Sequence, residues 1–171
     1  MLSYVRVNPF DLFENLRDDV NTIFEMLDSD KENQFLRRIA IKTSFSYVEC
    51  IPYIMKYYLR RRLYKVQYKL NDKETTLLYE DDDYKISLLD NFKKTFKLAK
   101  KILLKEGFDL NTSGNEFKLL QKSIYVRDRI THPKKYSDIV ISDVEIYNVL
   151  ISTGYVEKVF FGFLNYEEEQ K

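Results

Sequence analysis

Glycine and proline are scarce in this chain, and this scarcity limits the folds that it can adopt. The 171 residues include four glycines and three prolines, while hydrophobic residues make up 44% of the sequence. All-β domains need glycine and proline at their frequent turns, whereas long helices need few turns. The composition therefore predicts an all-α fold, and the length fits a single domain over residues 1–171.

Capping signals and apolar spacing predict about five helices. The first begins at Asn8 and Pro9, because asparagine caps a helix and proline suits its first position. The second opens with Ser29 and Glu32, which are spaced as a capping box, and extends from about Asp30 to the mid-sixties. The other three open with Ser87 and Asp90, with Ser113 and Glu116, and with Ser142 and Glu145, and are expected to end near Gly107, His132 and Tyr166.

Residues 69–86 interrupt the helical pattern and include four consecutive acidic residues, Glu80 to Asp83. A charge run without apolar spacing is typical of a solvated loop, or of a short hairpin inserted between helices. We therefore expect an antiparallel up-and-down helical bundle with one acidic insertion.

The formal net charge of +1 predicts no global attraction to nucleic acid or to acidic membranes, so any RNA binding must come from a local patch. One candidate patch is a lysine face in the third predicted helix, formed by Lys93, Lys97, Lys100 and Lys101. Two interpretations stay open. The face is solvated, which is the commoner outcome for such a pattern, or it contacts RNA phosphates.

The single cysteine, Cys50, cannot form an intramolecular disulfide, and we expect it to fill space in the core. No leader segment and no apolar run long enough to span a bilayer is visible. These features predict a soluble cytoplasmic protein with no membrane partner. We expect no cofactor and no metal site.

The most informative segment is the end of the fourth predicted helix. Phe117, Leu120 and Ile124 form an apolar stripe that should face the core. Four polar residues continue this stripe and fill an arc of about 140° at the helical 100° per residue: they are Arg127, Asp128, Thr131 and His132. Burying such groups unpaired costs several kcal/mol, so we expect them to line a cleft, to pair with one another or to meet a partner chain.

Pro133 follows the only histidine of the chain, His132. Proline disfavours helical geometry at the preceding residue, so the helix should end or bend at His132. This end would place the imidazole beside a turn, where a ligand can reach it.

The string Arg127-Asp128-Arg129-Ile130-Thr131-His132 resembles the signature of HEPN domains. That signature is an arginine, a polar residue, three further residues and a histidine, near the end of the fourth helix of a small bundle. Proline after the histidine is also frequent in the family. The resemblance covers the whole helical layout, although the hexapeptide is its specific part.

The resemblance implies a metal-independent endoribonuclease, acting as a toxin or a defence effector. Family members of this kind work as two-fold dimers whose motifs meet across the interface, and the cleaved RNA carries a 2′,3′-cyclic phosphate. The residue chemistry agrees. Arg127 can hold a phosphate through its planar fork of donors, and His132 can transfer protons near neutral pH. Asp128 could orient the imidazole or fix Arg127. One histidine per chain is too few for acid and base together, but two chains supply two.

Four further residues are candidates for supporting roles. Glu49 loosely resembles a glutamate that some HEPN groups place in the second helix, although a surface or network carboxylate is the commoner explanation. Arg129 and Lys134 should favour the neutral imidazole, and Thr131 belongs to the polar arc. In one toxin subgroup a tyrosine that receives nucleotides stands two positions after the histidine. Lys134 stands there in this chain, so that regulation is not expected.

The expected partners are RNA, a second copy of the chain and a cognate antitoxin or regulator. Two alternatives to the nuclease stay open. The chain could be a non-catalytic HEPN-like module that binds RNA, a nucleotide or a protein, or it could be a helical scaffold in which the motif is a coincidence.

Overall fold

The structure, a computed structural model, describes residues 8–79, 86–104 and 107–165. Over these residues the chain is entirely helical, with six α-helices, one 3-10 helix and no strand. The prediction of an all-α helical bundle is confirmed. The elements are α1 (Pro9–Ser29), α2 (Gln34–Leu63), α3 (Asp72–Tyr79), α4 (Leu88–Ile102), α5 (Asn115–Thr131), the 3-10 helix η1 (Tyr136–Ile139) and α6 (Asp143–Asn165).

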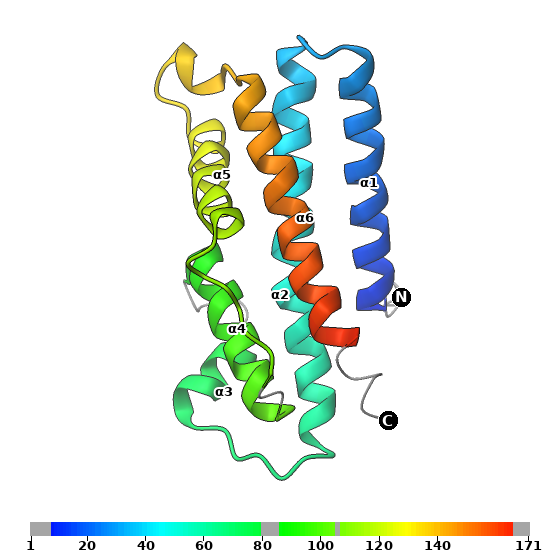
Figure 1. Cartoon of the computed structure of the whole chain (residues 1–171), viewed down its shortest axis with the longest axis vertical. Coiled ribbons are helices and arrows are strands. Elements are labelled where there is room, and N and C mark those ends of the chain that lie inside the picture. The colour runs from blue at the N-terminus through cyan, green and yellow to red at the C-terminus, as the bar shows by residue number, and fades with distance from the viewer. Residues whose placement is uncertain (1–7, 80–85, 105–106, 166–171) are drawn as a thin grey trace, which may run out of the picture.

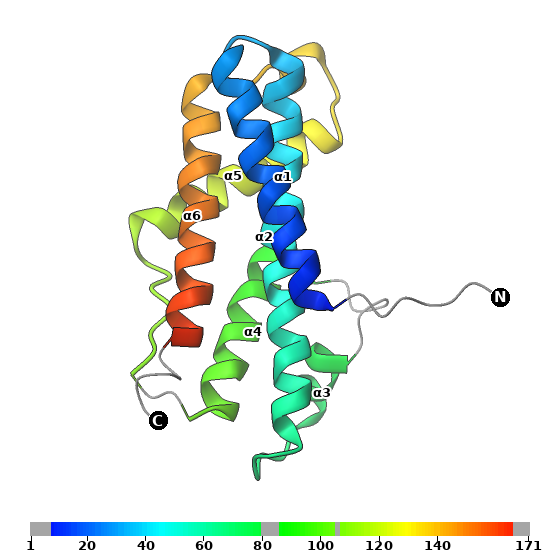
Figure 2. The ribbon, with the colours of Figure 1, turned by 90° about the vertical axis from the view of Figure 1, so that its right-hand side faces the viewer.

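The long helices lie side by side around α2. Helices α1 and α6 both pack along α2, and α5 packs against α6 on the side away from α1 (Figure 1). Helix α4 lies below α5 and runs along the C-terminal half of α2, in both views (Figures 1 and 2). The two connected pairs, α1 with α2 and α5 with α6, are antiparallel (Figure 1).

Helix α2 is buried on most of its surface because it has neighbours on several sides. Ile41, Ile51, Ile54 and Leu59 are fully buried, and they contribute to a core cluster that draws residues from all six α-helices. An amphipathic surface helix would show one apolar stripe, whereas a helix with neighbours all around is apolar on more than one face. The helix is 30 residues long and includes Pro52.

The first helix begins after Asn8 as predicted, but the junction between α1 and α2 differs from the prediction. Ser29 is the last residue of α1, and the N-cap of α2 is Asn33, whose side-chain oxygen accepts hydrogen bonds from the backbone N–H groups of Phe35 and Leu36. The predicted capping box of Ser29 and Glu32 is therefore wrong. Asparagine is as strong a cap as serine, and the Ser29 hydroxyl donates instead to the carbonyl of Glu25.

The predicted capping box of Ser113 and Glu116 is also wrong, whereas that of Ser142 and Glu145 is confirmed. Helix α5 begins after Gly114, since the side chain of Asn111 accepts hydrogen bonds from the backbone N–H groups of Ser113 and Gly114. At the start of α6, the Glu145 carboxylate accepts from the Ser142 backbone N–H at 2.9 Å, and the Ser142 hydroxyl accepts from the Glu145 N–H.

The predicted loop or hairpin over 69–86 contains a helix instead, α3. An ion pair between a half-exposed lysine and a buried glutamate holds this helix against α4, because Glu74 accepts from the Lys101 ammonium at 2.7 Å. Leu77 and Leu78 enter the core. The apolar signal of this two-turn helix is too short to recognise beside the acidic run, whose residues 80–83 lie outside the described part of the chain.

Helix α4 ends at Ile102, earlier than the predicted stop at Gly107. The residue that takes the left-handed backbone conformation after the helix is Leu104, with φ 51°. Glycine or asparagine is the usual residue in this position, because a Cβ is strained there. The expected signal, glycine after the last apolar residue, therefore gave an end that is too late.

The start of α2 holds the connection between α5 and α6. Gln34 both donates to the carbonyl and accepts from the N–H of Ile141, and the buried Arg37 donates to the same carbonyl at 2.7 Å. Arg38 donates to the carbonyl of Ile139 at 3.0 Å. These bonds satisfy backbone groups that would otherwise be left unpaired near the core, and they hold the segment before α6 against the start of α2.

A buried hydroxyl pair links α5 to α6. The Ser123 and Ser152 oxygens are 3.0 Å apart, and both residues are almost completely buried. The Ser152 hydroxyl also donates to the carbonyl of Asn148 in its own helix. Within the described residues, no helix has the length and apolar character required to cross a membrane.

Replacing the observed cap should cost more stability than replacing the predicted one. We expect Asn33→Ala to lower the free energy of unfolding by about 1 kcal/mol, because two backbone N–H groups of α2 lose their acceptor. Ser29→Ala is the matched control and should change it by less than about 0.5 kcal/mol. Urea unfolding followed by circular dichroism measures both, and equal losses would contradict the assignment of the cap.

The thiol of Cys50 should be unreactive in the folded protein. Cys50 is buried in α2, and this burial raises the pKa of its thiol to about 11. Since the thiolate is the reacting form, we expect slow modification by a disulfide reagent at pH 8 and rapid modification after addition of denaturant. Fast modification without denaturant would show that this part of the core is open.

Candidate functional site

The motif lies on the C-terminal half of α5, beside its buried face rather than on it. The buried residues of α5 are Phe117, Leu120, Ser123, Val126 and Ile130. Val126 and Ile130 continue the buried face, so the prediction that Arg127, Asp128, Thr131 and His132 continue it is wrong. Two of the four nevertheless meet the expectation of a paired polar group beside a cleft, because Arg127 and Asp128 pair with each other and line an open hollow. Thr131 and His132 are exposed and do not line it.

The Arg127 side chain contacts both α2 and its own helix. It is 25% exposed, and its Nη2 atom donates to the Glu49 carboxylate of α2 at 2.8 Å. Its Nη1 atom lies 3.2 Å from the Asp128 carboxylate, and the guanidinium lies over the Phe45 ring at 5.5 Å. Three contacts from two helices therefore fix the plane of the guanidinium.

Asp128 was expected either to orient the imidazole or to fix Arg127, and the structure shows the second arrangement. Glu49 was expected either as part of the site or as a surface carboxylate, and it does contact Arg127. The structure thus brings together three of the predicted residues, Arg127, Asp128 and Glu49.

An open hollow of about 710 Å³ lies against this ion-pair network. We call it the Arg127 hollow. The start of α4 and the segment before it form one wall, and α5 with Glu49 of α2 forms the other. Its lining residues are Glu49, Ile86, Ser87, Leu88, Leu89, Asn91, Gln121, Ile124, Arg127 and Asp128. Asn91 and Gln121 are polar members that the sequence did not single out, since an amide on a helix surface has no distinguishing signal.

His132 ends α5, as Pro133 predicted. The helix stops at Thr131, and the His132 backbone N–H donates to the carbonyl of Asp128 at 3.0 Å. The side chain is exposed, and it makes no hydrogen bond or ion pair within residues 8–79, 86–104 and 107–165. His132 does not line the Arg127 hollow, so one copy of the chain does not join the imidazole to the guanidinium.

The remaining predicted residues have contacts that hold the end of α5. Arg129 pairs with Glu145 of α6 at 3.0 Å and donates to the carbonyl of Val140. The Thr131 hydroxyl donates to the carbonyl of Arg127 within α5. The polar groups of Arg129 and Thr131 are therefore used in contacts that stabilise the fold.

The turn after His132 is organised by Asp138. Its carboxylate accepts from the backbone N–H groups of Lys134 and Lys135, at 2.8 and 3.1 Å. These donors hold the pKa of Asp138 below its usual value, because they favour the charged form. The side chain of Lys134 is exposed beside this turn and stays free to contribute to the local positive charge.

No three histidine, cysteine, aspartate or glutamate side chains in the described ranges are grouped so that they could hold a metal ion.

No protein-family model, no curated protein and no solved structure matches this chain. The resemblance to HEPN domains therefore stays a prediction from the sequence. The motif ends the fifth α-helix rather than the predicted fourth, because α3 was not predicted.

The ion pair between Arg127 and Glu49 should have a measurable but small effect on stability. Because Glu49 is about half exposed, a double-mutant cycle with Arg127→Ala and Glu49→Ala should give a coupling energy of about 0.2–1 kcal/mol, which falls as salt is added. Urea unfolding of the four proteins measures it. A second cycle on Arg129 and Glu145 is the control, since that pair is less exposed and should give a coupling at least as large.

A coupling energy of zero at low salt for the Arg127 and Glu49 pair would contradict the expected stabilisation. It would show that this ion pair adds nothing measurable to the free energy of unfolding.

Proposed function

We propose that this chain is a metal-independent endoribonuclease whose active site is completed by a second copy of the chain. Arg127 holds the scissile phosphate, and His132 transfers the protons. Asp128 and Glu49 position Arg127. The observation that carries the proposal is the guanidinium held by two carboxylates at the edge of an open hollow, five residues before an exposed imidazole at a helix end.

The contacts of Arg127 leave it able to bind a phosphate. Each terminal nitrogen of a guanidinium carries two hydrogens, and one carboxylate contacts each of these nitrogens. One N–H on each terminal nitrogen is therefore left as a donor. A pair of such donors matches two oxygens of a phosphate, and charge-assisted bonds of this kind are stronger than neutral ones.

The proposed reaction uses the RNA as its own nucleophile. A base removes the proton of the 2′-hydroxyl, whose oxygen attacks phosphorus. The bond from phosphorus to the 5′-oxygen breaks, and an acid donates a proton to this leaving oxygen. The products are a 2′,3′-cyclic phosphate and a 5′-hydroxyl. An imidazole can serve in either step near neutral pH, and two copies of His132 supply both.

Exposed apolar side chains near the motif support a second copy as the partner. Tyr125, Tyr136, Val144 and Tyr147 are 71%, 80%, 66% and 60% exposed, and they lie on α5, η1 and α6. Tyrosines are enriched at the centres of protein interfaces, where charged residues are depleted. If two copies pack against each other through this surface, the interface lies close to both motifs.

A second candidate function is a non-catalytic module that binds RNA, a nucleotide or a protein. One observation favours it: within one chain the imidazole contacts neither Arg127 nor the hollow that Arg127 lines. The experiment that tests the nuclease distinguishes the two candidates.

Purified protein should cleave RNA in the presence of a chelator, with products that end in a 2′,3′-cyclic phosphate. We expect His132→Ala and Arg127→Ala each to lower the cleavage rate by about 10²-fold or more, since each removes a group that acts on the reacting atoms. Lys122→Ala is the control, because Lys122 is an exposed cation on α5 outside the hollow. Gel analysis and mass spectrometry of the products measure the outcome.

Three results would contradict the proposal. Cleavage that survives both substitutions would come from another site or from a contaminant. The absence of cleavage of any RNA by the unaltered protein would favour the binding module. A strict monomer by light scattering at micromolar concentration would remove the shared site. A toxin or defence role, a cytoplasmic location and a cognate antitoxin remain predictions of the HEPN resemblance.

A further inference from the structure

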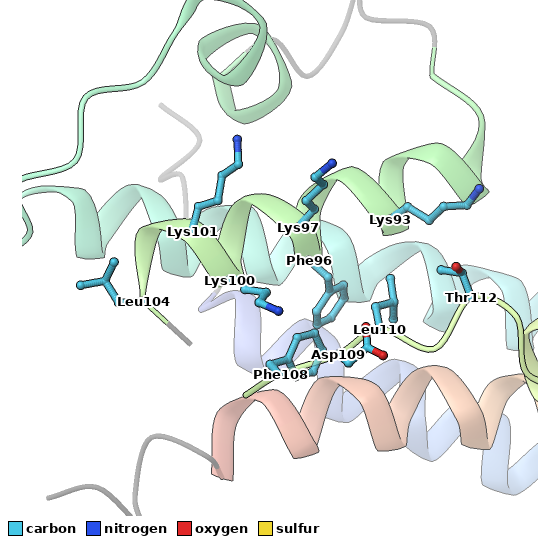
Figure 3. Close-up of a pocket in the computed structure, with 10 residues that line it drawn as sticks. All are labelled: Lys93, Phe96, Lys97, Lys100, Lys101, Leu104, Phe108, Asp109, Leu110 and Thr112. Carbon is cyan, nitrogen blue, oxygen red and sulfur yellow. The ribbon is translucent and has the colours of Figure 1, made fainter. Parts of the chain in front are cut away.

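A second hollow, of about 700 Å³, lies further along α4 (Figure 3). It lies between the C-terminal half of α4 and the segment 108–112 that leads to α5, and we call it the α4 groove. Its lining combines apolar side chains with lysines. The lining residues are Lys93, Phe96, Lys97, Lys100, Lys101, Leu104, Phe108, Asp109, Leu110 and Thr112.

The floor of the α4 groove is apolar. Phe108 is partly exposed and stacks on the buried Phe96, with ring centroids 6.1 Å apart and an interplanar angle of 24°. Leu110 lies beside these rings (Figure 3). A planar apolar group could therefore pack against this floor without displacing core side chains.

Four lysines and one carboxylate, Asp109, belong to the lining of the groove. Lys101 is paired with Glu74, and Lys93 is 3.9 Å from Asp90. Lys97 and Lys100 form no ion pair with any residue that the structure describes. In Figure 3 the Lys100 side chain extends toward the Phe96 and Phe108 rings, whereas the Lys97 and Lys101 side chains extend from α4 away from them. The lining thus has more cations than carboxylates, with one cation directed at the apolar floor and the others along α4.

Leu104 is an unusual residue for its place in the groove. Its side chain is 81% exposed, and its backbone is in the left-handed region, where a leucine is strained. Neither core packing nor backbone preference accounts for a leucine here. A strained and exposed apolar residue beside a hollow is a reason to test for a ligand.

We propose that the α4 groove binds a single-stranded segment of RNA, with phosphates on the lysines and bases against the apolar floor. This inference rests on the proposed endoribonuclease and names the form of its substrate. Single-stranded nucleic acid is commonly bound in this way, by cations that follow the backbone and by apolar or aromatic side chains that contact the bases.

The arrangement of charge favours RNA over a single amphiphilic anion such as a fatty acid. Lys93 and Lys101 are eight residues apart, which is about 12 Å along the helix axis. One carboxylate headgroup would need cations at one end of the groove, whereas successive phosphates need them along its length. The same helix also lines the Arg127 hollow with its first residues, so a strand in the groove can extend toward Arg127.

The test uses binding of a fluorescent oligoribonucleotide with 2′-O-methyl groups, which cannot be cleaved by 2′-hydroxyl attack. The variant Lys97→Ala/Lys100→Ala should weaken binding about tenfold, and it should reduce the slope of log affinity against log salt by about 1.4, since each phosphate contact on a single strand contributes about 0.7. The variant Lys118→Ala/Lys122→Ala is the control, because it removes two exposed lysines from α5 outside the groove.

A second variant tests the contribution of Leu104, at the end of the groove, without loss of folding. Leu104→Asn introduces a residue that tolerates the left-handed backbone and removes the exposed apolar side chain. We expect its thermal stability to be unchanged or higher and its affinity for the oligonucleotide to fall about threefold, with the same salt slope, because no cation is lost.

Cleavage kinetics separate this inference from the proposed function. If the unaltered protein cleaves RNA, the Lys97→Ala/Lys100→Ala variant should raise KM and leave kcat unchanged. If this variant binds the oligonucleotide with the affinity and salt slope of the unaltered protein, the inference about the α4 groove is wrong, and the proposed nuclease is unaffected. Groove-dependent binding without any cleavage would support the groove and reject the nuclease. Binding of a fluorescent long-chain fatty acid, with no binding of the oligonucleotide, would also overturn the inference.

Discussion

The burial of α2 is the constraint on which the rest of the structure depends. This helix packs against α1, α4, α5 and α6, so each of them is positioned by reference to it. Its first residues hold the connection before α6 through Gln34 and Arg37, and its middle presents Glu49 to Arg127. A single element therefore sets both the packing of the bundle and the position of the one guanidinium that the proposed chemistry needs.

The candidate site separates into a fixed part and an open part. Arg127 is held by carboxylates from α2 and α5, whereas His132 is exposed at the end of α5, where Asp138 organises the following turn. Preorganised donors suit a group that binds a phosphate, because they need not reorganise when charge develops. An exposed imidazole suits a group that must meet a partner strand or a second subunit. The division of contacts thus agrees with different roles for the two residues.

The fold class and the end of α5 were predictable from the sequence because they depend on local rules. Sparse glycine and proline favour helices, and Pro133 ends the helix at His132. The start of α2 was predicted at the wrong residue because Ser29 and Asn33, four positions apart, are both residues that cap helices, and Asn33 is the one that accepts from the first N–H groups of α2. The helix α3 was not predicted because two turns show little apolar periodicity. Its position also depends on the ion pair between Glu74 and Lys101, and Lys101 is distant in sequence. The contact between Glu49 and Arg127 was only suggested, since no spacing rule joins residues 78 positions apart.

The hydroxyl contact between Ser123 and Ser152 limits how α5 can move on α6. Apolar side chains pack acceptably in several neighbouring registers, but two hydroxyls in a dry interface satisfy each other in one. Sliding α5 by one turn would separate these oxygens and leave at least one unpaired in the core. It would also carry Arg127 away from Glu49. Two small polar atoms in the core thus help to keep the guanidinium in place one turn further along the helix.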